Sequence, residues 1–199
     1  NEHAGGTCFI IAVDAKTSET AWRLDRDTSL ASYITPTVYS PEDGPEQLIF
    51  ASTGYGVYSV NPDSGEVYWE VQCDFEFKPC ACPTIVNDVI FVSTGKGGGG
   101  VESVAIRAPD VTKYEAPKVL YQLEPPFPYV TTPLVLDDKI FFWQDSGFLR
   151  CITAETGETV WEERIGGTFY ASPVMIGDKI LNINVRGEAI IFDTSDGFK

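Results

Sequence analysis

Side chains that could carry out catalysis are few and do not stand together. The sequence contains one histidine, His3, so a serine or cysteine nucleophile would find no other histidine to act as its base. The neighbouring acids Asp137 and Asp138 would point to opposite faces of a strand or lie in a solvated turn. We therefore expect no catalytic residue in this chain.

The five cysteines do not form a regular disulfide framework. Cys8 and Cys151 lie in apolar runs and are predicted to be buried thiols. A bridge from Cys73 to Cys80 or Cys82 stays open, beside the alternative that all three are reduced. The Cys-Ala-Cys triplet lacks the further ligands that zinc needs, so we expect no metal site.

Two loops and one aromatic residue are the remaining candidates for ligand binding. The glycine-rich segment 95–100 lacks the spacing of a phosphate-binding loop and is predicted to be a turn between strands. We expect the loops at 95–101 and 110–118 to lie on one face and to bind a partner. The residues concerned are Lys96, Gly97, Gly98, Asp110 and Lys113. Trp143, close to Asp145, could line a cofactor pocket, but packing within the sheets is the interpretation we favour.

A repeat in the sequence would position these candidate residues. Its clearest sign is a tryptophan that recurs at the same position of three repeat units. Trp22, Trp69 and Trp161 each stand ten residues after a small residue. Gly65 and Gly157 precede the second and third tryptophan by four residues, where a turn needs a left-handed backbone. Each of these segments is predicted to be two strands joined by a tight turn.

A second column, of prolines, gives the period. Pro36, Pro83, Pro133 and Pro173 each open an apolar strand, and they are 47, 50 and 40 residues apart. Four short strands per unit at a period of roughly 40–50 residues indicate the blades of a β-propeller. The chain is then an all-β single domain of three full four-stranded antiparallel blades and two partial ones. Their predicted ranges are 7–27, 31–74, 78–123, 129–166 and 168–199.

Packing of blade on blade explains the large side chains. A sheet with two apolar faces needs a neighbour on each side, so we expect Trp22, Trp69 and Trp161 to lie between blades. The blade at 78–123 has no such tryptophan, and Tyr121 is predicted to take its place. The two part-blades leave three arrangements open: a closed ring of four blades, a segment of a larger propeller, which we favour, or a ring assembled from two copies.

The pattern resembles the PQQ-like β-propeller repeat, whose blades close with a tryptophan-docking motif of the form A-x-D-x-x-T-G-x-x-x-W. The matching residues are Ala12, Asp14, Thr17 and Trp22; Asn61, Ser64, Gly65 and Trp69; and Thr156, Gly157 and Trp161. The resemblance covers nearly the whole chain and is more specific for fold than for function.

The resemblance implies two classes of function. The first, which we favour, is a non-catalytic, BamB-like binding or scaffold module for a protein or peptide partner, with no cofactor. The second is a segment of a quinoprotein dehydrogenase that uses PQQ with calcium, although the adjacent cysteine pair of that branch is missing here. A third class, drawn from exposed aromatic residues, is a carbohydrate or small-ligand binder that uses Tyr55, Tyr129 and Phe169.

The net charge and the hydropathy of the chain limit the kinds of partner and the cellular compartment that we expect. The formal net charge of −15 argues against nucleic acid and anionic membrane surfaces as partners. No apolar run reaches the roughly 20 residues of a transmembrane helix, and no signal peptide is visible at Asn1. The resemblance implies an extracytoplasmic protein, periplasmic, in the envelope or secreted. Incomplete sheets at the ends also favour self-association or added blades.

Overall fold

The structure, a computed structural model, describes residues 8–26 and 30–194. These residues form eighteen short strands, β1 to β18, and one turn of 3-10 helix, η1 (Val111–Lys113), which confirms the all-β prediction. In the described part of the chain, no helix is long and apolar enough to cross a membrane.

Antiparallel pairing groups the strands into sheets that follow one another along the chain. The first sheet contains β1 (Cys8–Val13) and β2 (Thr20–Arg26), and the second contains β3 (Thr37–Tyr39), β4 (Gln47–Ser52), β5 (Gly56–Val60) and β6 (Val67–Val71). The third contains β7 (Lys78–Pro79), β8 (Thr84–Val86), β9 (Val89–Lys96), β10 (Gly99–Arg107) and β11 (Lys118–Tyr121). The fourth contains β12 (Leu134–Leu136), β13 (Lys139–Trp143), β14 (Phe148–Thr153) and β15 (Thr159–Arg164), and the last contains β16 (Val174–Ile176), β17 (Lys179–Ile183) and β18 (Ala189–Asp193).

The third sheet departs from the four strands expected of each full blade, because it has five. Its first strand is broken: β7 and β8 both pair with β9, at Lys78–Pro79 and Thr84–Val86. Between them the backbone turns away from β9, and the N–H of Ala81 donates to the carbonyl of Tyr129 at 3.1 Å. The prolines at the edge of the break remove donors that a continuous strand would need.

Both faces of the central sheets are apolar, because each sheet is covered on both sides. In β4, Ile49 and Ala51 point to the third sheet, whereas Leu48 and Phe50 point to the first. Strand alternation produces this division, since neighbouring side chains leave a strand on opposite faces. Four separate hydrophobic clusters result, one at each junction between consecutive sheets.

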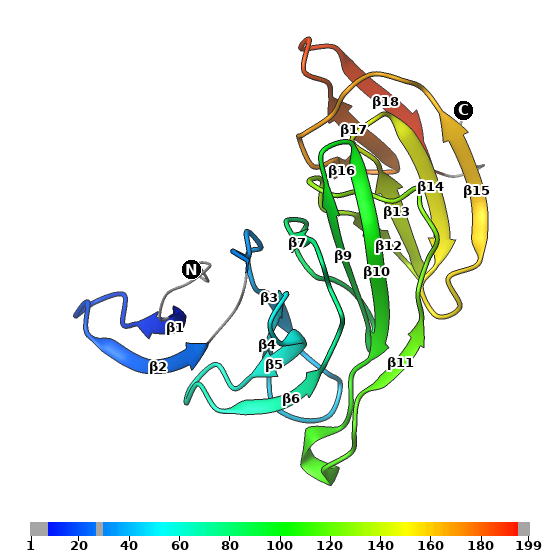
Figure 1. Cartoon of the computed structure of the whole chain (residues 1–199). Coiled ribbons are helices and arrows are strands. Elements are labelled where there is room, and N and C mark those ends of the chain that lie inside the picture. Colours follow the sequence, from blue (N-terminus) through cyan, green and yellow to red (C-terminus); the bar gives the residue numbers. More distant parts are fainter. Residues whose placement is uncertain (1–7, 27–29, 195–199) are drawn as a thin grey trace.

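The sheets follow an arc, and the two ends of the arc stay apart (Figure 1). The hairpin β1–β2 lies at one end and β16–β18 at the other, with no strand pairing between them in the described residues. The sheets formed by residues 8–26 and 30–194 therefore do not close into a ring of four blades. The end sheets each cover a neighbour on one side only.

Candidate functional site

The first tryptophan of the column ties the first sheet to the second. Trp22 on β2 is 9% exposed, and its indole N–H donates to the carbonyl of Pro62 at 2.8 Å. Its ring covers Gly65, where an added Cβ would lie 2.6 Å from an indole carbon. Gly65 has a φ of 75° in the turn between β5 and β6, so its backbone and its lack of a side chain are both required.

The other two tryptophans also lie at sheet junctions but have different partners. Trp69 on β6 is buried, and its N–H donates to the side-chain oxygen of Gln47 at 2.8 Å. Trp161 on β15 is half-buried and packs its ring near Phe141 and Phe192, at centroid distances of 6.1 and 6.0 Å. Phe192 belongs to the last sheet, so Trp161 contacts its following neighbour as Trp22 does.

Tyr121 on β11 occupies the corresponding place in the third sheet, as the sequence predicts. Its ring covers Gly157, where an added Cβ would lie 2.8 Å from two ring carbons. Its hydroxyl donates to the carbonyl of Ala154 at 2.6 Å. Burial, with a smaller contribution from the charge of Glu155, raises the pKa of Tyr121 to about 12, so the hydroxyl stays a donor.

The two loops predicted to form one binding face lie at opposite ends of a hairpin, and that prediction is wrong. Lys96 pairs with Gly99 at one end of β9 and β10, whereas Val89 pairs with Arg107 at the other end, next to η1 (Figure 1). At about 3.3 Å per residue, the intervening strand separates the loops by roughly 25 Å. A single small partner surface cannot contact both.

In both loops, the charged side chains predicted to bind a partner contact other residues of this chain. The ammonium of Lys96 lies 4.5 Å from the centre of the Phe77 ring, while Gly97 and Gly98 have open space around them. Asp110 caps η1 and pairs with Lys113 at 2.7 Å. This hydrogen bond from Lys113, with those from Thr112, lowers the pKa of Asp110 to about 2.

The residues considered for a quinone site do not fit one. Trp143 is 1% exposed, and its ring is enclosed by Phe169 and Phe192 at centroid distances of 5.1 and 5.7 Å, which leaves no open face for a quinone. Asp145 accepts the N–H groups of Tyr129 and Val130, at 3.3 Å each. Burial raises its pKa, and it belongs to no group of three metal-ligating side chains in the described residues.

Two further candidate groups have different outcomes. Phe169 is fully buried, so it cannot serve as an exposed platform for a sugar, whereas Tyr55 and Tyr129 are half-buried. Cys73, Cys80 and Cys82 form no disulfide. The disulfide alternative is therefore not realised in this structure.

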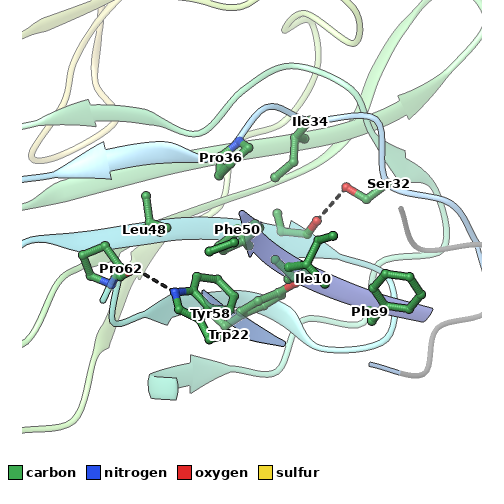
Figure 2. Close-up of a pocket in the computed structure, with 13 residues that line it drawn as sticks. Phe9, Ile10, Trp22, Ser32, Ile34, Pro36, Leu48, Phe50, Tyr58 and Pro62 are labelled. Atoms are coloured by element: carbon green, nitrogen blue, oxygen red, sulfur yellow. Dashed lines mark hydrogen bonds between the residues drawn. The ribbon is translucent and has the colours of Figure 1, made fainter. Parts of the chain in front are cut away.

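An open cleft that the sequence analysis did not predict lies between the first hairpin and the second sheet. Its volume is about 590 Å³. Figure 2 shows Ile10 and Phe9 of β1 on one side and Phe50 and Tyr58 of the second sheet on the other. Its lining is otherwise mostly apolar, with side chains from Ile11, Ala12, Trp22, Ser32, Ile34, Pro36, Leu48, Ala51 and Pro62.

Among the described residues, the first sheet has two strands and the second sheet, which faces it across the cleft, has four. In the first sheet, β1 pairs with β2 over all of its length. The second sheet is uncovered on its inner half: Val38 of β3 is 55% exposed on the face that also carries Leu48. The residues that line the cleft are spread from Phe9 to Pro62, so no local sequence pattern indicated it.

A buried arginine holds the hairpin against the second sheet beside the cleft. Arg26 of β2 is 7% exposed and pairs with Glu70 of β6 at 2.6 Å. Its guanidinium carbon also lies 4.3 Å from the ring centres of Tyr55 and Tyr58. This contact and the Trp22 contact keep one wall of the cleft in place.

Comparison with known proteins gives one family and several similar structures. The sequence profile of a family described as outer membrane protein assembly factor BamB matches residues 3–117 and 129–199. Comparison with curated protein sequences gives no match.

Among solved structures, BamB from Moraxella catarrhalis aligns with a TM-score of 0.66 and 18% identity, over 89% of this chain and 51% of that chain. Sqt1 from Saccharomyces cerevisiae aligns with a TM-score of 0.71 and 8% identity, over 98% and 54%. The computationally designed Ika8 protein aligns with a TM-score of 0.63 and 10% identity, over 92% and 52%. These likenesses confirm the propeller fold, and the chain spans about half the length of each of these three proteins.

Proposed function

This chain belongs to the family described as outer membrane protein assembly factor BamB, and from that premise we propose that it is a non-catalytic scaffold that binds an extended segment of a protein. The observation that carries the proposal is the open apolar cleft beside β1. The family description names the outer membrane, which supports an extracytoplasmic location as part of the same proposal.

Strand addition is the binding mode that the cleft supports. An incoming extended segment would lie along residues 10–13 of β1 and add a strand at this end of the sheet. The apolar side chains of Leu48, Phe50 and Ile34 would receive alternate side chains of that segment. Main-chain hydrogen bonds then provide affinity, while the apolar wall selects the sequence pattern.

A hairpin peptide tests the proposal, because it reproduces the strand pair that full sheets place at this position. The probe is a synthetic peptide of residues 172–185, which covers β16 and β17 and contains no tryptophan. Its binding to the full chain is measured by titration calorimetry, with a scrambled peptide as control. We expect saturable binding with a negative heat-capacity change, the mark of apolar burial.

Matched variants place the binding in the cleft. Ile11 lines the cleft and is 44% exposed, whereas Val160 on β15 is 49% exposed and lies outside it. Ile11→Asp should weaken peptide binding at least tenfold, and Val160→Asp should leave it unchanged. Leu48→Asp, on the opposite wall, gives a second measurement. Equal binding by all three variants, or none by the unchanged chain, would overturn the proposal.

A further inference from the structure

A second cleft, which we call the β10 groove, follows the outer edge of β10 in the middle of the chain. Strand β9 pairs with β10 between Gly99 and Arg107, whereas β11 pairs with it only between Ala105 and Arg107. Figure 1 shows β10 continuing past the end of β11. The consecutive residues 101–104 line a cleft of about 400 Å³. They carry side chains of both faces of the strand, so the cleft lies along its edge.

Ser103 separates the two chains where the pairing of β10 with β11 stops. After Tyr121 the chain still lies beside β10, but its main chain bonds to a side chain there. The Ser103 hydroxyl accepts the N–H of Leu123 at 2.9 Å and donates to the carbonyl of Leu123 at 3.4 Å. This hydroxyl takes the place of ladder hydrogen bonds, so the departing chain is displaced from β10 and the groove opens beside it.

Two segments that leave their sheets line the rest of the groove, and they carry the same kinds of side chain. One segment follows β6 and the other follows β11. Each has an exposed glutamine one residue after its strand and an exposed acid three residues after it. These side chains are Gln72 and Asp74 in the first segment, and Gln122 and Glu124 in the second. Amides and carboxylates therefore enter the groove from both segments.

The segment after β6 is held against β10 by Glu102. The carboxylate of Glu102 accepts the N–H of Glu76 at 2.9 Å and the N–H of Phe77 at 3.3 Å. It also accepts the hydroxyl of Thr94. These neutral donors fix the carboxylate in place and leave its charge uncompensated, so Glu102 adds a third negative charge to the groove.

The β10 groove attracts cations, because its carboxylates have no basic partner. Its lining includes Asp74, Glu102 and Glu124 but no lysine, arginine or histidine. Within residues 8–26 and 30–194, none of the three carboxylates forms an ion pair. Arg150 donates to the main-chain oxygen of Glu124, at 3.2 Å. In the same described ranges, these acids are not part of a group that could hold a metal ion, so we expect a cation that the groove binds by its shape and charge.

Apolar side chains in the groove favour a peptide over a simple cation. Val101 on β10 is 37% exposed and Val119 on β11 is 47% exposed, and both line the groove. A ligand that covers these two side chains removes apolar surface from water, which a polyamine without apolar side chains does less well. The glutamine amides beside them can bond to the main chain of a peptide.

We propose that the β10 groove docks an extended segment of a partner protein in which lysine or arginine alternates with apolar residues. Alternation matches the groove, because an extended segment directs successive side chains to opposite sides. Basic side chains pair with Asp74 and Glu124, and apolar ones cover Val101 and Val119. The site goes beyond the proposed function, since it shares no lining residue with the cleft beside β1.

The probe is a capped, fluorescently labelled heptapeptide in which lysine alternates with valine. Its binding to the full chain is measured by fluorescence anisotropy. We expect saturable binding by one peptide per chain that weakens as salt is added, because salt screens the charges. A peptide with glutamate in place of lysine should not bind. A peptide of the same composition with its lysines in one block should bind less tightly, and equal binding of the two lysine peptides would overturn the extended mode.

Two pairs of neutralising substitutions separate the groove from the charge of the whole molecule. Asp74→Asn combined with Glu124→Gln removes two carboxylates of the groove and should weaken binding about tenfold. Asp63→Asn combined with Glu162→Gln changes the net charge equally at exposed sites outside the groove and should change binding less than about twofold. Equal weakening by the two pairs would overturn the proposal.

A cation built into the groove gives a second measurement. Val101→Arg places a guanidinium beside the carboxylates and should abolish binding of the lysine peptide, whereas Val160→Arg adds the same charge at an exposed position on β15 and should not. Unchanged binding by Val101→Arg would overturn the assignment. The 172–185 peptide should not displace the lysine peptide. Binding of the 172–185 peptide alone would overturn this inference and leave the proposed function standing, and binding of the lysine peptide alone would do the reverse.

Discussion

At the scale of single residues, the junctions between sheets depend on an aromatic ring set against a glycine. Trp22 covers Gly65 and Tyr121 covers Gly157, and in both pairs the ring also donates a hydrogen bond to a backbone carbonyl of the next sheet. The ring can pack at this position only against glycine, because the Cβ of any other residue would overlap the ring atoms. The glycine is needed a second time because its φ is positive.

Removing the Trp22 ring should be costly. Trp22→Ala should lower the free energy of unfolding by about 3–5 kcal/mol, because it opens a cavity in the cluster around Phe50 and Tyr58. Trp22→Phe keeps a ring but loses the bond to Pro62, for a loss of about 1 kcal/mol beyond the reduced packing. Urea denaturation measures both; equal effects of the two variants would contradict this view.

Comparing Gly65→Ala with Gly177→Ala separates the energetic cost of losing the ring contact from the cost of a left-handed backbone. Both positions have positive φ, 75° and 63°, but only Gly65 has a ring within 4 Å. Each variant should lose about 1–2 kcal/mol for the left-handed backbone. Gly65→Ala should lose more, because Trp22 must move; equal losses in thermal or urea denaturation would show that the ring contact contributes nothing.

Two buried thiols predict a loss of stability at high pH. Burial raises the pKa values of Cys73 and Cys151 to about 11, whereas exposed thiols in the unfolded chain ionise near 9. Between pH 9 and pH 11 the unfolded state binds fewer protons than the folded state. The contribution of the two thiols to the free energy of unfolding is therefore complete below pH 9 and is lost as the pH rises toward 11. Cys73→Ala and Cys151→Ala should each flatten the pH dependence of urea denaturation relative to the unchanged chain. An unaltered slope would show that the thiols do not titrate in this range.

At the scale of elements, the β9–β10 hairpin shows that a glycine-rich segment can be partly loop and partly core. Gly97 has open space around it, whereas a Cβ on Gly100 would overlap the ring of Phe127, which is fully buried. The N–H of Gly100 also donates to the carbonyl of Phe127 at 2.9 Å. The connector between the third and fourth sheets is thereby held against β10.

Replacing Gly97 and Gly100 with alanine should affect the melting temperature to different extents. Gly97→Ala should change the melting temperature little, because nothing lies within 4 Å of the new methyl group. Gly100→Ala should lower it by several degrees, because Phe127 would have to leave its site. A neutral result for Gly100→Ala in differential scanning calorimetry would contradict the close packing of this segment.

At the scale of the whole molecule, the end sheets are covered on one side and the central sheets on both. Amide hydrogen exchange should therefore be faster in β1, β2 and β16–β18 than in β4, β5 and β9, because local opening exposes less apolar surface there. The measurement belongs at low protein concentration. Uniform exchange across all sheets would contradict the open arc.

The pattern of residues along the chain was enough to predict an all-β fold of short antiparallel strands, but not the broken first strand of the third sheet. Recurring prolines, turn residues and tryptophans are local signals, and the strand alternation that follows them depends on neighbours a few positions away. Tyr121 could be proposed from the same column because the blade at 78–123 has no tryptophan there, and the structure then shows its ring over Gly157. These features repeat, so each copy supports the interpretation of the others.

The relative position of the loops and the presence of the cleft needed the tertiary structure. A hairpin reverses the chain, so Lys96 and Asp110 can be close in sequence and yet stand at opposite ends of the same two strands. The cleft is lined by residues of β1, β2, β4 and β5 that are far apart in the sequence, so no local pattern could indicate it. The structure was likewise needed to show that Phe169 is buried in the core. The sequence alone does not indicate whether an aromatic side chain is enclosed between sheets or exposed to water.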